Sequence, residues 1–282
     1  MKIYKISFLL IPFIVILLSS LSCSQEPEIQ MYKIDPQKIE TKKSIPMEHK
    51  IFLANMLPSI QYENDSILLD RKFVKEILQD IKNDKNISGS EKSTVDHISV
   101  KYDLSKIQWN KSDKTKIIAS FDSLLLRVDI IPIKLVMAQV IIESGWGSSR
   151  FAKEANNYFG IHCYTPGCEL KPDSTENSKF EVKKFASIRS AIQNYLHILN
   201  TGYAYIYLRK VRSEFRQENQ ALDPIKIAQG LEHYSQIGDE YTDLISNIIT
   251  NYLPENIEAL FEKTILRGKV PCLPAGMANF KL

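Results

Sequence analysis

One segment constrains the fold of this chain more than any other. The run from Pro132 to Glu143 is apolar on nearly every side of a helix, through Leu135, Val136, Met137, Val140, Ile141 and Ile142. A helix that is apolar all round is buried at the centre of a protein. Pro132 suits a first helical position, and Gly145 and Gly147 end the helix after Glu143. We therefore expect other helices to pack around this segment.

Apolar residues recur at helical spacing on both sides of the central segment. They predict a helical pair over about 47–83 with a break near Asn64-Asp65, and helices over about 117–128, 188–199, 205–216, 224–232 and 239–253. Residues 84–113 are rich in Lys, Asp, Ser and Asn, so we expect an irregular connection with a short strand near 97–102. A polar turn and alternating apolar residues predict a small β-hairpin within 171–186. The predicted fold class is mainly α.

The N-terminus carries an export signal. Lys2 and Lys5 precede an apolar run, a small-residue stretch and then Cys23, which is the order found in secretory signals. The position of Cys23 resembles the lipobox of bacterial lipoproteins, in which this cysteine becomes the lipidated N-terminus. An uncleaved anchor and a plain secretion signal are alternatives, although so short an apolar run spans a bilayer poorly. We expect a lipid-anchored protein of the bacterial cell envelope.

The chain is expected to have five parts. These are a lipoprotein signal peptide (1–22), a polar tether (23–46), an N-terminal helical extension (47–115), a main helical domain (116–255) and a C-terminal tail (256–282). The formal charge is +3, and it falls to +1 when Lys2 and Lys5 leave with the signal peptide. A nearly neutral protein has no strong electrostatic attraction to nucleic acid, so this class of partner is excluded.

Two cysteines near the middle of the chain are expected to pair. Cys163 and Cys168 flank the turn-forming sequence Tyr-Thr-Pro-Gly, and an exported protein can keep a disulfide bond. His162 beside Cys163 offers a zinc site as the alternative, but two Cys and one His make weak zinc evidence. We expect a disulfide bond and no metal or other cofactor. Cys272 has no evident partner.

Glu143 is the candidate catalytic residue. It lies at the C-terminal end of a buried helix, where the helix dipole and burial both disfavour a negative charge and raise the pKa of the carboxyl group. A carboxylic acid that stays protonated near neutral pH is what a glycosidase needs to protonate a departing sugar oxygen. The alternative is a structural acid that pairs with Arg150 and closes the helix end.

The residues around Glu143 carry a family resemblance. The run from Ala138-Gln139 through Glu143-Ser-Gly-Trp-Gly, followed by Ala155-Asn-Asn-Tyr-Phe-Gly160, closely resembles the signature of the bacterial peptidoglycan endo-β-N-acetylglucosaminidase family. This family includes the flagellar rod-assembly hydrolase and the autolysin glucosaminidase domain, and the nearest branch is Bax-like. The resemblance is strong over about 130–253. It extends more weakly from about 47, where Phe52–Pro58 also resembles the Bax-like branch.

The resemblance implies a fold and a substrate. The fold is lysozyme-like, with a helical domain and a small β-hairpin lobe that flank a cleft, and 116–255 becomes the glucosaminidase domain. The substrate is the glycan strand of peptidoglycan, cut at the β-1,4 link that follows N-acetylglucosamine. We expect a monomer that contacts the membrane only through its lipid anchor.

Several residues near Glu143 are candidates for substrate binding: Ser144, Trp146, Asn156, Asn157, Phe159 and Gly160. Aromatic rings can stack on sugar faces, and Asn amides suit N-acetyl and hydroxyl groups. The structural alternatives are that Trp146 packs in the core and that the Asn side chains cap a turn.

A second catalytic group is not fixed by a motif. Glycosidases usually pair two carboxylates, and Glu181 is the first candidate to position a water, with Glu169 and Glu176 as alternatives. By resemblance Tyr234 matches a tyrosine important to activity, and Tyr241 matches the second aromatic. A Tyr hydroxyl would orient the acetamido group of the substrate as an internal nucleophile. The usual Tyr-Ala-Thr-Asp-Pro is replaced here by Tyr234-Ser-Gln-Ile-Gly.

The sequence is compatible with other functions. The main rival is a catalytically silent lysozyme-like lipoprotein that binds glycan strands or uses its N-terminal helices to dock envelope partners. A lysozyme-type cut at the other glycan bond and endo-cleavage of N-glycans are further alternatives.

Overall fold

The computed structural model describes residues 28–110, 113–163, 181–231 and 239–267. The chain divides into two compact units. One is Met31–Thr264, and the other combines Met1–Gln30 with Ile265–Leu282. Helices α1 to α9 all belong to the unit Met31–Thr264.

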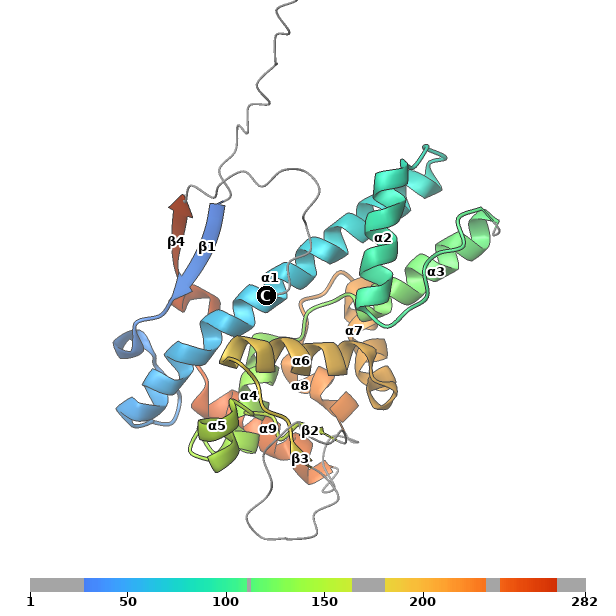
Figure 1. Cartoon of the computed structure of the whole chain (residues 1–282). Helices are drawn as coiled ribbons and strands as arrows, with labels where there is room; N and C mark the ends of the chain where they lie inside the picture. Colours follow the sequence, from blue (N-terminus) through green and yellow to red (C-terminus); the bar gives the residue numbers. More distant parts are fainter. Residues whose placement is uncertain (1–27, 111–112, 164–180, 232–238, 268–282) are drawn as a thin grey trace, which may run out of the picture. The chain divides into compact units, whose positions relative to one another are not determined.

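Helices dominate the described residues (Figure 1). The α-helices are α1 (Met47–Lys82), α2 (Gly89–Lys101), α3 (Lys114–Arg127), α4 (Ile133–Ser144), α5 (Arg150–Ala155), α6 (Ile188–Thr201), α7 (Ile206–Gln217), α8 (Pro224–Ala228) and α9 (Asp239–Tyr252). Short 3-10 turns are η1 (Pro36–Lys38), η2 (Tyr203–Tyr205), η3 (Gln229–Leu231) and η4 (Glu258–Leu260). The strands β1 (Glu28–Lys33) and β4 (Glu262–Arg267) pair with each other, as do β2 (His162–Cys163) and β3 (Glu181–Val182).

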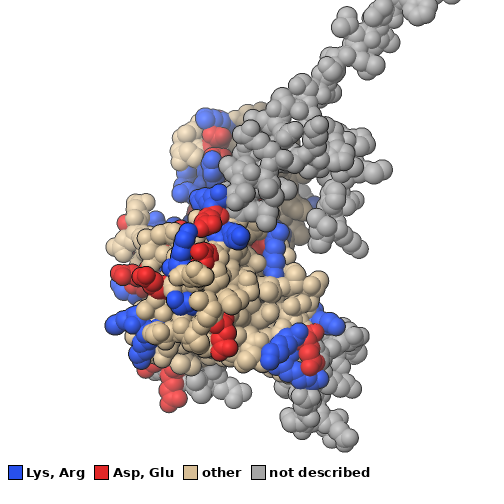
Figure 2. Space-filling model, turned by 90° about the vertical axis from the view of Figure 1, so that its left-hand side faces the viewer, with Lys and Arg blue, Asp and Glu red and all other residues tan. Residues whose placement is uncertain are grey.

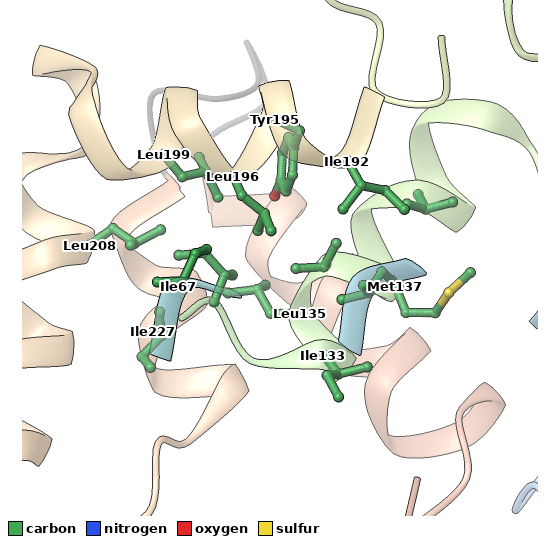
Figure 3. Packing of buried hydrophobic residues seen from close by; sticks show 14 of the residues in the cluster. Ile67, Ile133, Leu135, Met137, Ile192, Tyr195, Leu196, Leu199, Leu208 and Ile227 are labelled. Carbon is green, nitrogen blue, oxygen red and sulfur yellow. The ribbon is translucent and has the colours of Figure 1, made fainter. Parts of the chain in front are cut away.

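Helix α4 is the centre of the core, as its apolar sequence predicts. Leu135, Val136 and Met137 are fully buried, and α1, α8 and α9 pack against the helix. Figure 3 shows Ile192, Tyr195, Leu196 and Leu199 of α6 pointing into the cluster that also holds Leu135 of α4 and Ile67 of α1. The predicted mainly α fold with a small β-lobe is confirmed.

The β-lobe starts earlier than the sequence indicates. His162 pairs with Val182 and Cys163 with Glu181 in an antiparallel arrangement. The second strand therefore lies within the predicted hairpin region of 171–186, whereas the first strand precedes it. Residues 164–180 lie outside the described residues.

Helix α1 is longer than predicted, because the expected break at Asn64-Asp65 does not occur. The Asn64 amide donates to the carbonyl of Ile131 at 2.9 Å, and the Asp65 carboxylate accepts from Gln61 at 2.6 Å and also from the Tyr32 hydroxyl. Both polar side chains thus bind other parts of the molecule or their own helix instead of forming a turn.

Helix α2 replaces the expected short strand and the middle of the irregular connection expected over 84–113. It begins at a capping box, in which the Ser88 hydroxyl accepts from the Glu91 N–H at 3.3 Å and the Glu91 carboxylate accepts from the Ser88 N–H at 2.7 Å. This pair satisfies backbone donors that a helix start leaves open. The helix forms despite its polar sequence because these donors are satisfied.

Part of the expected tether packs on the helical body. Ile34, Ile39 and Ile45 are buried, and the N–H of Lys43 donates to the carbonyl of Asn251 at 2.8 Å. Residues 31–46, α1 and α2 belong to the same compact unit as the main helical domain. Scattered isoleucines in a polar segment thus anchor it to the helical body. The division of the chain into five parts stays a prediction.

The surface carries mixed charge. On the face shown in Figure 2, lysines and arginines alternate with aspartates and glutamates around a broad uncharged area. In the described ranges, no helix is both long and apolar enough to cross a bilayer.

Candidate active site

The end of α4 turns sharply directly after Glu143. Gly145, Trp146 and Gly147 all have left-handed backbones, with φ of 55°, 57° and 74°. This conformation is easy for glycine and costly for tryptophan. Ser144 is fully buried, and its hydroxyl donates to the Val140 carbonyl at 2.6 Å and accepts from the Gly147 N–H at 2.8 Å. Ser144 therefore fixes the turn from the inside.

Helix α1 holds the strained Trp146. The ring of His49 stacks on the indole at a centroid distance of 3.9 Å and an interplanar angle of 3°. Phe52 meets the indole edge-on at 6.1 Å, and a Cβ at Gly147 would lie 2.6 Å from Phe52 Cε2. Trp146 is half-buried and packs against α1, and a contact of its exposed part with sugar stays a prediction.

Glu143 is half-buried, and its carboxyl group is held at one oxygen. The Tyr241 hydroxyl donates to Glu143 Oε1 at 2.7 Å. Burial raises the pKa of Glu143, and this outweighs the opposite effect of the Tyr241 hydrogen bond. The alternative ion pair with Arg150 does not form, because Arg150 Nε binds Glu154 at 3.1 Å. The raised pKa that the helix position predicted is thus present.

A buried polar chain leads to Tyr241 from the core. The Tyr195 hydroxyl donates to Gln139 Oε1, and Gln139 Nε2 donates to the Tyr241 oxygen at 3.1 Å. Gln139, Tyr195 and Tyr241 are all almost completely buried. Because Gln139 supplies a donor to Tyr241, the phenolic proton of Tyr241 is directed to Glu143. Sequence reasoning did not identify Gln139 or Tyr195, although a glutamine within an otherwise apolar helix was a visible signal.

The hydrogen bonds from Tyr195 through Gln139 to Tyr241 determine which oxygen of Glu143 can carry its proton. Oε1 accepts from Tyr241, so the proton of the neutral acid belongs on Oε2. Oε2 lies 3.8 Å from the position that a Cβ would take at Gly160. Gly160 is exposed with φ of 64°, and among the described residues no donor binds Oε2. As far as the described residues go, the missing side chain at Gly160 therefore leaves the proton-bearing oxygen open to a ligand.

The two predicted Asn residues fasten the β-lobe to the helices. Asn156 ends α5 in a left-handed conformation and donates to the Phe185 carbonyl at 3.0 Å. Asn157 is buried, and its amide donates to the carbonyls of Ile161 and Lys183, both at 2.8 Å, and accepts from the Ile161 N–H at 3.0 Å. The Asn157 amide is fully used, because both of its donor hydrogens and its oxygen already have partners.

Three predicted substrate-binding side chains lie inside the protein. Phe159 is 2% exposed and stacks on the ring of Tyr195 at 3.9 Å. Ser144 and Asn157 are equally inaccessible. Their burial supports a role in positioning the backbone around Glu143, and direct sugar contact by these three residues stays a prediction. Of the predicted set, Gly160 is the exposed member.

Some of the predicted residues lie outside the described residues. These are Cys23, Cys168, Glu169, Glu176 and Tyr234. The backbone of Glu181 lies in β3, but its side chain is not described, so its catalytic role stays a prediction. Cys163 is disulfide-bonded, and its pairing with Cys168 also stays a prediction. Within the described ranges, no group of three or more His, Cys, Asp or Glu could hold a metal ion.

The central helix of this mainly α domain ends at a half-buried carboxyl group with a raised pKa. Glycosidases of the lysozyme-like class have this arrangement. Residues 118–253 match the family described as mannosyl-glycoprotein endo-beta-N-acetylglucosaminidase. The chain is also 30% identical over 196 residues to Protein bax of Escherichia coli (strain K12). This match covers 70% of the chain and 66% of that relative, so the chain spans just under two thirds of its length. No solved structure matches. The chain belongs to the glucosaminidase family, in its Bax-like branch.

Proposed function

We propose that this protein is an endo-β-N-acetylglucosaminidase that cuts the glycan strands of peptidoglycan, with Glu143 as the general acid. One observation carries the proposal. The carboxyl group of Glu143 has its pKa raised by burial, its Oε1 held by Tyr241, and its Oε2 open beside Gly160. This is the arrangement that a proton donor to a glycosidic oxygen requires.

The proton transfer follows from these contacts. Oε2 of the neutral Glu143 gives its proton to the glycosidic oxygen as the bond from C1 to that oxygen breaks, and the leaving strand departs with a new hydroxyl group. The carboxylate that remains keeps the hydrogen bond from Tyr241. Hydrogen bonds to a charged acceptor are about twice as strong as neutral ones. Tyr241 therefore stabilises the product of proton transfer more than the starting acid.

The nucleophile has two candidate sources. If Glu181 positions a water on the opposite face of the sugar, the reaction inverts the anomeric centre. If Tyr234 orients the acetamido group of the substrate as an internal nucleophile, water later opens the resulting ring and the configuration is retained. The stereochemistry of the first product distinguishes these two routes.

Peptidoglycan is the proposed substrate because of the N-terminal signal. The family description names a mannosyl glycoprotein as the substrate, whereas the export signal and Cys23 of this chain support a lipid-anchored location in the bacterial envelope. The wall is the glycan polymer that such an enzyme meets.

The test is digestion of purified peptidoglycan by the full chain, beside the variants Glu143→Gln and Glu154→Gln. Glu154 is an exposed acid that pairs with Arg150, so it serves as the matched control. We expect wild type and Glu154→Gln to release products ending in reduced N-acetylglucosamine, as identified by mass spectrometry, and Glu143→Gln to release none. Products ending in reduced N-acetylmuramic acid would show a lysozyme-type cut. A folded wild-type chain that pellets with the wall but releases nothing would be a silent binder.

A further inference from the structure

A cavity lies away from Glu143. It has a volume of about 370 Å³ and lies between α1, the C-terminal end of α2, α6 and the residues that follow β3. On α6 it is lined by Ser190, Gln193, Asn194, Leu196, His197 and Asn200. At 100° per residue Ser190, Gln193 and His197 lie on the side of α6 opposite Tyr195, whereas Asn194 and Leu196 lie on the flanks of the helix. Helix α6 therefore lies between these three lining residues and the Tyr195 side chain of the polar chain that holds Glu143.

Among the described residues around this cavity, one cation has no acidic partner. Three lining groups already have partners: Glu63 with Arg189 at 2.5 Å, Lys101 with Asp70 at 2.7 Å, and His197 with Asp103 at 3.2 Å. Lys183 also lines the cavity, and its ammonium group lies 5.3 Å from the centroid of the Phe185 ring. Among the described residues, no carboxylate lies within 4 Å of the Lys183 ammonium. A ligand with a negative charge complements this balance.

The rest of the lining is apolar on one side and polar but uncharged on the other. Ile67, Leu196 and Phe185 supply hydrocarbon surface, and Gln193 and Asn194 supply amide groups. Small-molecule sites typically combine such apolar walls with a few placed polar groups in a volume of about 300–1,000 Å³. The cavity therefore suits a small amphipathic anion with amide groups of its own.

We propose that this cavity binds the carboxyl end of a short peptide, with Lys183 as the partner of the terminal carboxylate. Peptide N–H and C=O groups match the amides of Gln193 and Asn194, and small apolar side chains match Ile67 and Leu196. In a second step, which rests on the function proposed above, this peptide is the stem attached to the glycan strand that Glu143 cleaves.

The position of Lys183 connects the two sites. Its carbonyl accepts from Asn157, and the carbonyl of Phe185 accepts from Asn156. The wall of the cavity and the turn at Gly160 thus belong to one hydrogen-bonded unit. A stem of about four residues reaches up to about 14 Å, which exceeds the thickness of a helix at about 10–12 Å. On this proposal one strand places its sugar at Glu143 and its peptide in the cavity.

The first experiment measures peptide binding to the full chain by calorimetry. The probes are an alanine-rich tetrapeptide whose only carboxylate is the terminal one, and the same peptide with a terminal carboxamide. We expect wild type to bind the acid at least tenfold more tightly than the amide, because a hydrogen bond to a charged group is stronger than one to a neutral group. Lys183→Met should abolish this preference.

Two further variants control the result. Lys184 is the exposed neighbour and does not line the cavity, so Lys184→Met should keep the preference for the acid. Gln193→Glu adds a negative charge at an exposed lining position and should weaken binding of the acid form only. Equal affinity of wild type for both peptides would overturn the proposal. An equal loss of preference in Lys183→Met and Lys184→Met would overturn it as well.

The second experiment separates this inference from the proposed function. Glycan strands with intact stems, and strands stripped of peptide, are digested by wild type and by Lys183→Met. We expect the variant to raise KM for the stem-bearing strands only and to leave kcat unchanged. If wild type cuts both strands and Lys183→Met has the same KM as wild type, the stem assignment fails and the hydrolase stands. If the chain binds the free-acid peptide but cuts neither strand, the hydrolase fails and the peptide site stands.

Discussion

Replacing Gly147 with alanine tests how the turn after Glu143 is held. Gly147 has φ of 74°, and a Cβ there would lie 2.6 Å from Phe52 Cε2 and 3.1 Å from Cδ2. The Phe52 ring has little room to retreat, because it packs edge-on against Trp146 and lies beside Tyr158. The substitution therefore combines a backbone strain with a steric clash.

The two costs can be estimated separately. A left-handed backbone costs a residue with a Cβ about 1–2 kcal/mol, and overpacking a fixed site costs about 1–3 kcal/mol. We expect Gly147→Ala to lower the free energy of unfolding by about 2–5 kcal/mol. Gly145→Ala is the matched control, because its φ is 55° but its Cβ would meet only the Ser148 hydroxyl oxygen at 3.1 Å. It should show only the backbone cost, about 1–2 kcal/mol.

Urea unfolding of the two variants, each in the wild-type and the Phe52→Ala background, isolates the clash. In the Phe52→Ala background the cost of Gly147→Ala should fall to that of Gly145→Ala, which gives a coupling energy of about 1–3 kcal/mol between Gly147 and Phe52. The cost of Gly145→Ala should not depend on Phe52. If Gly147→Ala is no more costly than Gly145→Ala, or costs the same in both backgrounds, α1 does not support the turn as described.

Three further predictions concern charge and hydrogen bonding. Tyr241→Phe removes a hydrogen bond that lowers the pKa of Glu143, so the alkaline limb of kcat/KM should move to higher pH. Its kcat should fall by about ten- to a hundredfold, since hydrogen bonds to charged groups contribute about 1.5–3 kcal/mol. Because burial raises the pKa of Glu143, its ionised form destabilises the fold. Glu143→Gln should therefore raise the melting temperature at pH 8, and much less at pH 4. Burial raises the pKa of Asp129, but Arg216 and Arg212 outweigh it and the net pKa is lowered. Its stabilisation is thus present above the unfolded pKa of about 3.9 and lost as the pH falls further. Asp129→Asn should cost about 3–5 kcal/mol at pH 7, because it leaves the buried Arg212 uncompensated. Urea unfolding at pH 7 and pH 3 checks this, with a smaller difference expected at pH 3.

The sequence predicts what depends on local pattern. The apolar run of α4 identifies the core helix, and the position of Glu143 at its end predicts a raised pKa. The helix start at Ser88 is also marked in the sequence, because Ser88 and Glu91 have the spacing of a capping box, whereas the polar composition of the segment indicates an irregular connection. A local sequence pattern predicts a structural feature when neighbouring residues alone determine that feature.

Features that depend on distant partners were not predictable in this way. Nothing near Asn64 indicates that its amide binds the carbonyl of Ile131, so the break predicted in α1 was reasonable and wrong. The stacking of His49 on Trp146 joins residues that are far apart in the chain. Asn157 has the composition of a sugar-binding residue, and only its burial and its three hydrogen bonds show that its amide is already used.

Glu143 is held by two supports that come from different parts of the chain. The polar chain through Gln139 and Tyr241 fixes Oε1 from within the region that matches the family, residues 118–253. The turn after Glu143 is held by His49 and Phe52, which lie outside that region on α1. A left-handed tryptophan persists only where its surroundings compensate for the strain. Because those surroundings are supplied by α1, this helix is part of the apparatus that positions the acid, and a fragment that began at residue 118 would lack half of it.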